Sequence, residues 1–148
     1  MVSIRKASTT DIPAMSRLLT ASITSLCTED HGNDPDRLRR WTQNKSEEGV
    51  GKMMDNPALT VWVAEVSSEI AAVGAATGDS IVLNYVAPEY RFQGVSKALL
   101  ATLEDSLRNA GISLGKLVST RTALRFYLAS GWSELGSGAG GIQMQKVL

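Results

Sequence analysis

The feature that most constrains the fold is a run of three short apolar segments followed by a helix and a further strand. Valine, isoleucine and alanine dominate the segments 60–66, 70–77 and 80–86, and short polar breaks separate them. Breaks of that length join antiparallel neighbours in a meander. A strand, a crossover helix and another strand then place one parallel pair in the sheet. The sequence therefore predicts an α/β protein of mixed α+β type, with a mostly antiparallel central sheet flanked by helices.

The other elements follow from periodicity and from helix-start and helix-stop residues. Before the meander we expect a strand at 3–6, a helix from a cap at Thr9 or Thr10 to about Leu26, and a helix at 36–54 that Gly49 and Gly51 break in two. After it we expect a helix at 94–110, a strand at 114–119, a helix at 122–130 and a strand at 142–147. The predicted order is β-α-α-β-β-β-α-β-α-β, and a further strand at 132–135 is left open.

Length and composition exclude several classes of protein. The chain has 148 residues, which is the size of one domain spanning 1–148. Its 15 basic residues balance 15 acidic ones without a long basic run, so we expect no nucleic-acid partner. No segment is long and apolar enough for a membrane span, and the N-terminus lacks the apolar core of a secretory signal. Cys27 is the only cysteine, which disfavours a disulfide or a metal site. We therefore expect a soluble cytoplasmic protein without a metal.

The most informative stretch is the connection between the segment at 80–86 and the helix at 94–110. A helix N-terminus carries unpaired N–H groups and a partial positive charge, so it binds anions. Gly94 has no Cβ and lets an anionic group approach the backbone. Arg91 and Lys97 add charge on either side, and the Ser96 hydroxyl can donate a hydrogen bond. The pattern fits a pyrophosphate site, although a plain strand-to-helix turn with Gly94 as steric relief explains it as well.

Other phosphate motifs fit the sequence less well. The Walker motif needs a second glycine five residues before Gly94, and position 89 is a glutamate. A formal GxGxxG occurs at Gly136, Gly138 and Gly141. It opens no predicted helix and stands outside any strand–helix–strand unit, so it carries no dinucleotide-binding meaning.

Two spaced motifs resemble those of the GNAT superfamily of acyl-CoA-dependent acyltransferases. The run Arg91-Phe92-Gln93-Gly94-Val95-Ser96 resembles motif A, [QR]-x-x-G-x-[GA], with a serine as the final small residue. The pattern Ala123-x-x-Phe126-Tyr127-x-x-x-Gly131-Trp132 resembles motif B. The run 84–88 is similar to the end of the family's fourth strand, and the predicted element order is that of the family along the whole chain.

The resemblance implies a set of cofactor-binding residues. Backbone N–H groups of Phe92, Gln93, Gly94, Val95, Ser96 and Lys97 are expected to bind the pyrophosphate of coenzyme A, assisted by the side chains of Arg91 and Lys97. Tyr85 and Val86 lie on a strand that splays from its neighbour, and their backbone groups are expected to pair with the pantetheine arm. The Val86 N–H is the expected donor to the thioester oxygen. Thr120 stands where motif B often begins with an asparagine.

Tyr127 occupies the position where the family often places a tyrosine near the sulfur of coenzyme A. A neutral phenol can donate a proton to a departing thiolate. The resemblance thus implies that Tyr127 is the catalytic acid and also a cofactor contact. The alternative is that Tyr127 is a core aromatic residue beside Phe126.

The general base is the point at which the sequence departs from the family. Many members carry a glutamate on the fourth strand, and residues 81–85 contain none. Asn84 can instead position a water molecule. Glu29, Asp30 and His31 fall in the first inter-helix loop, which borders the acceptor pocket in the family. They are the acceptor-site candidates, and a solvated acidic loop is the alternative explanation for them.

The resemblance implies an N-acetyltransferase that uses acetyl-CoA as cosubstrate and acetylates a primary amine of a small molecule or protein. The amine is expected to attack the thioester directly in a ternary complex. The expected partner is this amine acceptor, and a homodimer is left open. A non-catalytic coenzyme A-binding or regulatory module of the same fold is the alternative. A nucleotide-binding domain of another fold is a weaker one, which binding of ATP or NAD would reveal.

Overall fold

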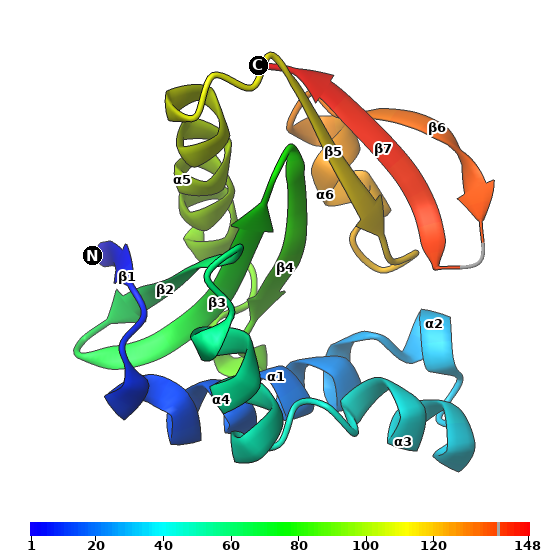
Figure 1. Ribbon diagram of the computed structural model, residues 1–148. Helices are drawn as coiled ribbons and strands as arrows, with labels where there is room; N and C mark the ends of the chain where they lie inside the picture. Colours follow the sequence, from blue (N-terminus) through cyan, green and yellow to red (C-terminus); the bar gives the residue numbers. More distant parts are fainter. Residues whose placement is uncertain (139) are drawn as a thin grey trace.

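A computed structural model describes residues 1–138 and 140–148 (Figure 1). Its strands form one sheet in the order β1-β2-β3-β4-β5-β7-β6. The strands are β1 (Val2–Lys6), β2 (Thr60–Val66), β3 (Glu69–Thr77), β4 (Ser80–Val86), β5 (Leu114–Ser119), β6 (Ser133–Gly138) and β7 (Gly141–Val147). Among the described residues, only β4 and β5 pair in parallel, and every other neighbouring pair is antiparallel. The predicted fold class is confirmed.

Helices cover both faces of this sheet (Figure 1). One face carries the short turn η1 (Thr9–Asp11), α1 (Ile12–Leu26), α2 (Thr28–His31), α3 (Pro35–Thr42) and α4 (Glu47–Asp55). The short turn η2 (Pro88–Tyr90) follows β4, and the opposite face carries α5 (Val95–Asn109) and α6 (Leu124–Ala129). No helix of the described chain is both long enough and apolar enough to cross a membrane.

The predicted helix at 36–54 is wrong in its point of interruption. The chain breaks between α3 and α4, before Ser46, whose hydroxyl accepts the Gly49 N–H at 3.1 Å and so starts α4. Gly49 and Gly51 lie inside α4. A Cβ on Gly49 would stand 2.2 Å from the Asn44 carbonyl oxygen, so the glycine permits a close backbone approach and does not end the helix.

Two other details differ from the prediction, and an element that the sequence left open is present. The first helical segment is capped by Ser8, not by Thr9 or Thr10, because the Asp11 carboxylate reaches back to the Ser8 N–H at 2.8 Å. The stretch expected to be a loop after Leu26 contains α2. The strand left open at 132–135 is present as β6 and pairs with β7, so Gly136, Gly138 and Gly141 of the GxGxxG pattern belong to these two paired strands.

The core lies on both sides of β3. Val73 and Ala75 pack toward α1 and α4, whereas Ala72 and Ala76 pack toward α5. Gly74 lets α5 come close, since a Cβ there would stand 2.9 Å from a methyl group of Leu103. Small residues on a central strand therefore set the distance between the sheet and the helix that begins at the glycine turn.

The sheet opens between β4 and β5. These strands pair only at Ser80 with Lys116 and at Ile81 with Leu117. Beyond Ile81 they diverge, and Figure 1 shows β4 and β5 running apart from their shared end. The predicted splay is confirmed, and it leaves the β5-facing edge of β4 unpaired as far as Val86.

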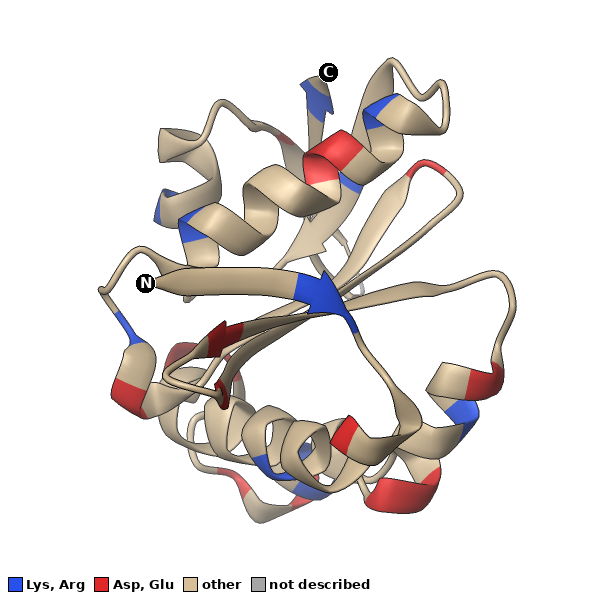
Figure 2. Ribbon diagram, turned by 90° about the vertical axis from the view of Figure 1, so that its left-hand side faces the viewer, with Lys and Arg blue, Asp and Glu red and all other residues tan. Residues whose placement is uncertain are grey.

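A network of ionic contacts fixes the N-terminal strand to the first helical turn. Segments of both charges are scattered over the ribbon in Figure 2, and the end of β1 is basic. The Arg5 guanidinium there donates to both Asp11 carboxylate oxygens at 2.7 and 2.9 Å, and it also pairs with Glu65. These bonds to Arg5 hold the pKa of the Asp11 carboxyl at about 2.

Replacing Asp11 with asparagine is expected to lower the free energy of unfolding at neutral pH by about 1–3 kcal/mol, because charge-assisted bonds are lost. Since the folded-state pKa lies below the ordinary value of 3.8, the carboxylate's contribution is full above that value and is lost as the pH falls toward 2. Urea unfolding at neutral pH and at pH values down through this window measures it. Asp105→Asn, which removes an exposed pair with Arg108, should cost under about 0.5 kcal/mol. Equal losses for the two variants would contradict the prediction.

Candidate active site

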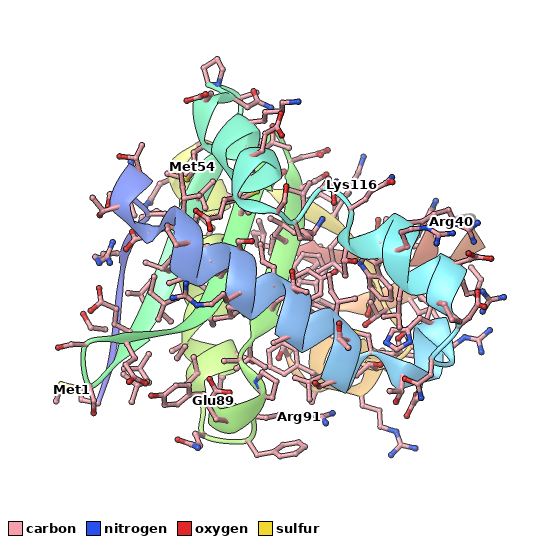
Figure 3. The ribbon with its side chains drawn as sticks, turned by 90° about the horizontal axis from the view of Figure 1, so that it is seen from below. Met1, Arg40, Met54, Glu89, Arg91 and Lys116 are labelled. Atoms are coloured by element: carbon pink, nitrogen blue, oxygen red, sulfur yellow. The ribbon has the colours of Figure 1, made fainter. Side chains whose placement is uncertain are left out.

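The opening between β4 and β5 is part of a cleft of about 1020 Å³. Four parts of the chain line it: β4, the connection from β4 into the first turn of α5, the segment from β5 through α6, and the segment from the end of α1 into α2. This volume suits a small-molecule site. Figure 3 views the molecule from the side of α1 and shows Glu89 and Arg91 near one another at the β4–α5 connection.

The glycine turn leaves the start of α5 free for an anion. Gly94 adopts φ +80°, and its carbonyl accepts the first helical bond, from the Ala98 N–H at 3.1 Å. Among the described residues no side chain caps this end, and no backbone carbonyl takes the N–H groups of Ser96 or Lys97. Since helix N-termini attract anions and Arg91 and Lys97 line the same cleft, this end of the cleft is suited to a phosphate.

The predicted cofactor residues lie together, with two exceptions. The residues that line the cleft are Tyr85, Val86, Arg91, Phe92, Gly94, Ser96, Lys97, Thr120 and Tyr127. Gln93 and Val95 do not. The Gln93 amide donates to the Glu89 carbonyl at 3.0 Å, and the Val95 side chain is buried in the core. At these two positions only the backbone is left for the predicted role.

Backbone alternation along β4 separates Val86 from Tyr85. In antiparallel strands, hydrogen-bonded pairs alternate with non-bonded pairs. The Ala87 N–H donates to the Ala71 carbonyl at 2.8 Å, and the register continues with Val86 opposite Ala72 and Tyr85 opposite Val73. Tyr85 is therefore at a hydrogen-bonded position toward β3, while the Val86 N–H points to the open edge.

This alternation corrects the prediction that both residues offer backbone groups to a bound arm. Val86 and, by the same alternation, Asn84 face the unpaired edge. Tyr85 contributes its side chain to the cleft, where burial raises the pKa of the phenol to about 12.

Tyr127 combines a core position with access to the cleft. Its ring makes edge contacts with Phe126 and Trp132, at centroid distances of 5.2 and 6.1 Å. The residue is only 5% exposed, yet it lines the cleft. The two interpretations of Tyr127 are thus compatible, since a packed ring can hold a hydroxyl at a fixed place.

Asn84 is the hydrogen-bond partner of the Tyr127 hydroxyl. Its side-chain amide donates to the Tyr127 oxygen at 3.1 Å. Burial raises the pKa of Tyr127 to about 12, and the Asn84 hydrogen bond acts in the opposite direction. The phenol therefore stays protonated at neutral pH, and because its oxygen already accepts from Asn84, its own hydrogen is free to be donated.

The turn before α6 is fixed by side-chain caps. The Thr120 hydroxyl accepts the Ala123 N–H at 3.1 Å. Asp30 on α2 accepts the Arg121 N–H at 2.7 Å and the Thr122 hydroxyl at 2.8 Å. These bonds tie the N-terminal helices to the turn that leads to Tyr127.

The three acceptor-site candidates therefore differ in their access to the cleft. Glu29 lines the cleft and its side chain is solvent-accessible. Asp30 does not line it, because its carboxylate caps the turn before α6. His31 is wrong as an accessible base: it is 1% exposed, Nε2 bonds to the Ile23 carbonyl at 2.8 Å, and Nδ1 accepts the Asn33 N–H at 2.9 Å.

Cys27, which the sequence places outside the motifs, lines the cleft from the end of α1, as do Ser22 and Leu26. Burial is the main cause that raises the pKa of the Cys27 thiol to about 11, so the thiol stays protonated and is a poor nucleophile. The positions Ser22 and Leu26 are four residues apart on one helix face, which is the signal that could have placed them together. Arg125 also lines the cleft, directly before the aromatic pair of motif B.

Comparison with known proteins agrees with this geometry. The family model described as an acetyltransferase (GNAT) domain matches residues 24–145, and no curated protein matches. A PaiA N-acetyltransferase from Thermoplasma acidophilum, solved in complex with coenzyme A, superimposes with a TM-score of 0.84 at 17% identity, over 100% of this chain and 99% of that one.

Two further solved structures share the fold. A GCN5-related N-acetyltransferase from Rhodopseudomonas palustris gives a TM-score of 0.84 at 18% identity, over 99% of this chain and 95% of that one. The ribosomal-protein-S18-alanine N-acetyltransferase from Escherichia coli gives 0.66 at 21% identity, over 99% and 94%. With the family model covering most of the sequence, the chain belongs to the GNAT family of acetyltransferases.

Proposed function

We propose that the protein transfers the acetyl group of acetyl-CoA to a primary amine by direct attack in a ternary complex. One observation carries the proposal: at the open edge of β4, Asn84 and Val86 face the cleft two residues apart, and Asn84 holds the Tyr127 hydroxyl at 3.1 Å. A donor for a developing oxyanion and a protonated acid therefore lie on neighbouring parts of one cleft.

The cleft fits an acyl-CoA as substrate. The free N–H groups at the start of α5, with Arg91 and Lys97, supply the donors that a pyrophosphate needs. The unpaired edge of β4 offers N–H and carbonyl groups to an extended amide-containing arm, as an added strand would find them. The Thermoplasma acidophilum structure holds coenzyme A in the same fold, which supports this assignment.

The carbonyl oxygen and the leaving thiolate each have a partner group in the cleft. The amine nitrogen attacks the thioester carbon, and the Val86 N–H stabilises the negative charge that develops on the carbonyl oxygen. The tetrahedral intermediate then breaks its carbon–sulfur bond. Tyr127 donates its proton to the departing thiolate, and the proton lost by the amine passes to water, from which Tyr127 is reprotonated.

The acceptor must be neutral when it attacks. Cys27, Tyr85 and Tyr127 all have a pKa raised to about 11 or 12, so none of them is a base at neutral pH. Glu29 remains the carboxylate candidate on the acceptor side. We infer that the transfer rate rises with pH along the titration of the acceptor amine. Alkyl amines with a pKa near 10 should be slower at neutral pH than α-amines with a pKa near 8.

An acceptor screen tests the proposal. The full-length protein is incubated with acetyl-CoA and a panel of polyamines, aminoglycosides, lysine derivatives and peptides with free N-termini, and thiol release is followed. Amine-dependent release with a mass gain of one acetyl group on the acceptor supports it. Tight acetyl-CoA binding without release by any amine would instead support the coenzyme A-binding module, for which the absence of a strand glutamate at 81–85 is the argument.

Replacing Asn84 with alanine is expected to lower the single-turnover rate by about 10-fold, which corresponds to one hydrogen bond of about 1.4 kcal/mol. Its amide orients the Tyr127 hydroxyl, so the same change should have little further effect in a Tyr127→Phe background. Rapid-quench measurements on the two single variants and the double variant give this coupling. Additive losses would show that Asn84 acts independently of Tyr127.

A further inference from the structure

Phe92 is the most exposed aromatic side chain near the cleft. The residue is 90% exposed and has φ +65°, a left-handed conformation that is disfavoured for a bulky side chain. Packing therefore does not account for an aromatic residue at this position, and glycine would suit the backbone better. Strained positions of this kind concentrate at ligand-binding sites.

The positively charged guanidinium of Arg91 lies over the Phe92 ring. The guanidinium carbon lies 4.6 Å from the centroid of Phe92, and both residues line the cleft. An aromatic ring together with an arginine plane forms a surface on which nucleobases stack. The pair thus has the chemistry of a base-stacking platform at the mouth of the cleft.

The position of Arg91 and Phe92 in the fold suits the nucleotide portion of an acyl-CoA. The pyrophosphate joins the pantetheine arm to the nucleotide. If it binds at Gly94 to Lys97 and the arm runs inward along β4 to Val86, the nucleotide must leave on the outer side of the turn. Phe92 lies at this turn, two residues before Gly94, with its ring in solvent.

We propose that the Phe92 side chain forms the subsite for the purine base of the acyl donor, with its ring stacked on the base and positioned by the contact with Arg91. The inference rests on the proposed acyl-CoA function and assigns to Phe92 a side-chain role that the motif resemblance does not give. An exposed aromatic contact for another protein is the competing explanation, and the choice of ligands below distinguishes the two.

The test compares two donors that differ in the nucleotide. Dissociation constants of acetyl-CoA and acetyl-4′-phosphopantetheine are measured by calorimetry for the wild type and for Phe92→Gly and Phe92→Trp. Glycine tolerates the positive φ, so that variant should fold and melt no lower than the wild type. We expect Phe92→Gly to weaken acetyl-CoA binding by about 10-fold and to leave acetyl-4′-phosphopantetheine binding unchanged, with tryptophan preserving both affinities.

Every outcome bears on the inference. If Phe92→Gly weakened the binding of both donors equally, the effect would lie in the turn and the stacking role would be overturned. Unchanged binding of acetyl-CoA in this variant would also overturn the stacking role. The latter result, with amine-dependent turnover by the wild type, would leave the proposed function standing. A wild type that does not bind acetyl-CoA would overturn both.

Discussion

Replacing Tyr127 with phenylalanine is expected to slow acetyl transfer in a single turnover by about 10²–10⁴-fold, the range of general acid catalysis. The substitution keeps the ring and its edge contacts with Phe126 and Trp132. It deletes only the hydroxyl that Asn84 orients. Because the proton is given in the transition state, the loss should appear in kcat, while acetyl-CoA affinity changes little.

The matched control is Tyr90→Phe. The Tyr90 hydroxyl donates to Glu69 at 2.8 Å on the surface, outside the cleft, so the same chemical change should leave the rate within about 2-fold of wild type. Since the pKa of Tyr127 is about 12, the wild-type rate should show no alkaline decline from this group near pH 10. Wild-type single-turnover rates in Tyr127→Phe, with chemistry limiting, would reduce Tyr127 to a core residue.

Replacing Gly94 with valine is expected to abolish stabilisation of the protein by acetyl-CoA. At a ligand concentration about 100 times Kd, mass action adds about 2.7 kcal/mol to the free energy of unfolding, which raises Tm by about 5–10 °C for a domain of this size. A branched side chain at φ +80° disturbs the turn and projects where the anion must approach. Thermal melts with and without acetyl-CoA measure the difference.

Gly111→Val is the matched control for that variant. Gly111 has φ +84° and, as at Gly94, its Cβ would meet nothing within 4 Å. It lies at the other end of α5, away from the cleft. Both variants should lose about 1–2 kcal/mol to the left-handed conformation, and only Gly94→Val should lose the ligand-induced shift. A normal shift in Gly94→Val would show that this turn does not bind the donor.

Local sequence patterns were enough to predict the β4–α5 turn at which the donor site is proposed. The strand end, the glycine turn and the following helix are contiguous in the chain, and a helix start exposes N–H groups whatever the rest of the fold does. Motif B likewise placed Tyr127 next to Phe126. These features depend on neighbours within a few residues, so their geometry follows from the sequence.

The fate of the proposed acceptor-side residues was not predictable in the same way. Glu29, Asp30 and His31 are adjacent in sequence and all polar, and yet their side chains lie in three different environments. The Asp30 carboxylate accepts hydrogen bonds from a turn about 90 residues away. His31 is buried, and both nitrogens of its ring form hydrogen bonds with backbone groups. Contacts between distant segments decide such outcomes, and a single sequence does not record them.

By itself the sequence determined the order of the main strands and helices, the parallel crossover, and the turn that begins α5, since periodicity, chain reversal and glycine act locally. Tertiary structure alone decided which backbone groups of β4 face the cleft, because that depends on register with β3. It also decided the surroundings of the Tyr127 hydroxyl, because burial raises the pKa of this phenol to about 12 and the hydroxyl accepts a hydrogen bond from Asn84, a residue 43 positions away. The sequence gives the identity of each side chain, whereas its solvent exposure and its hydrogen-bond partners depend on how the distant segments pack.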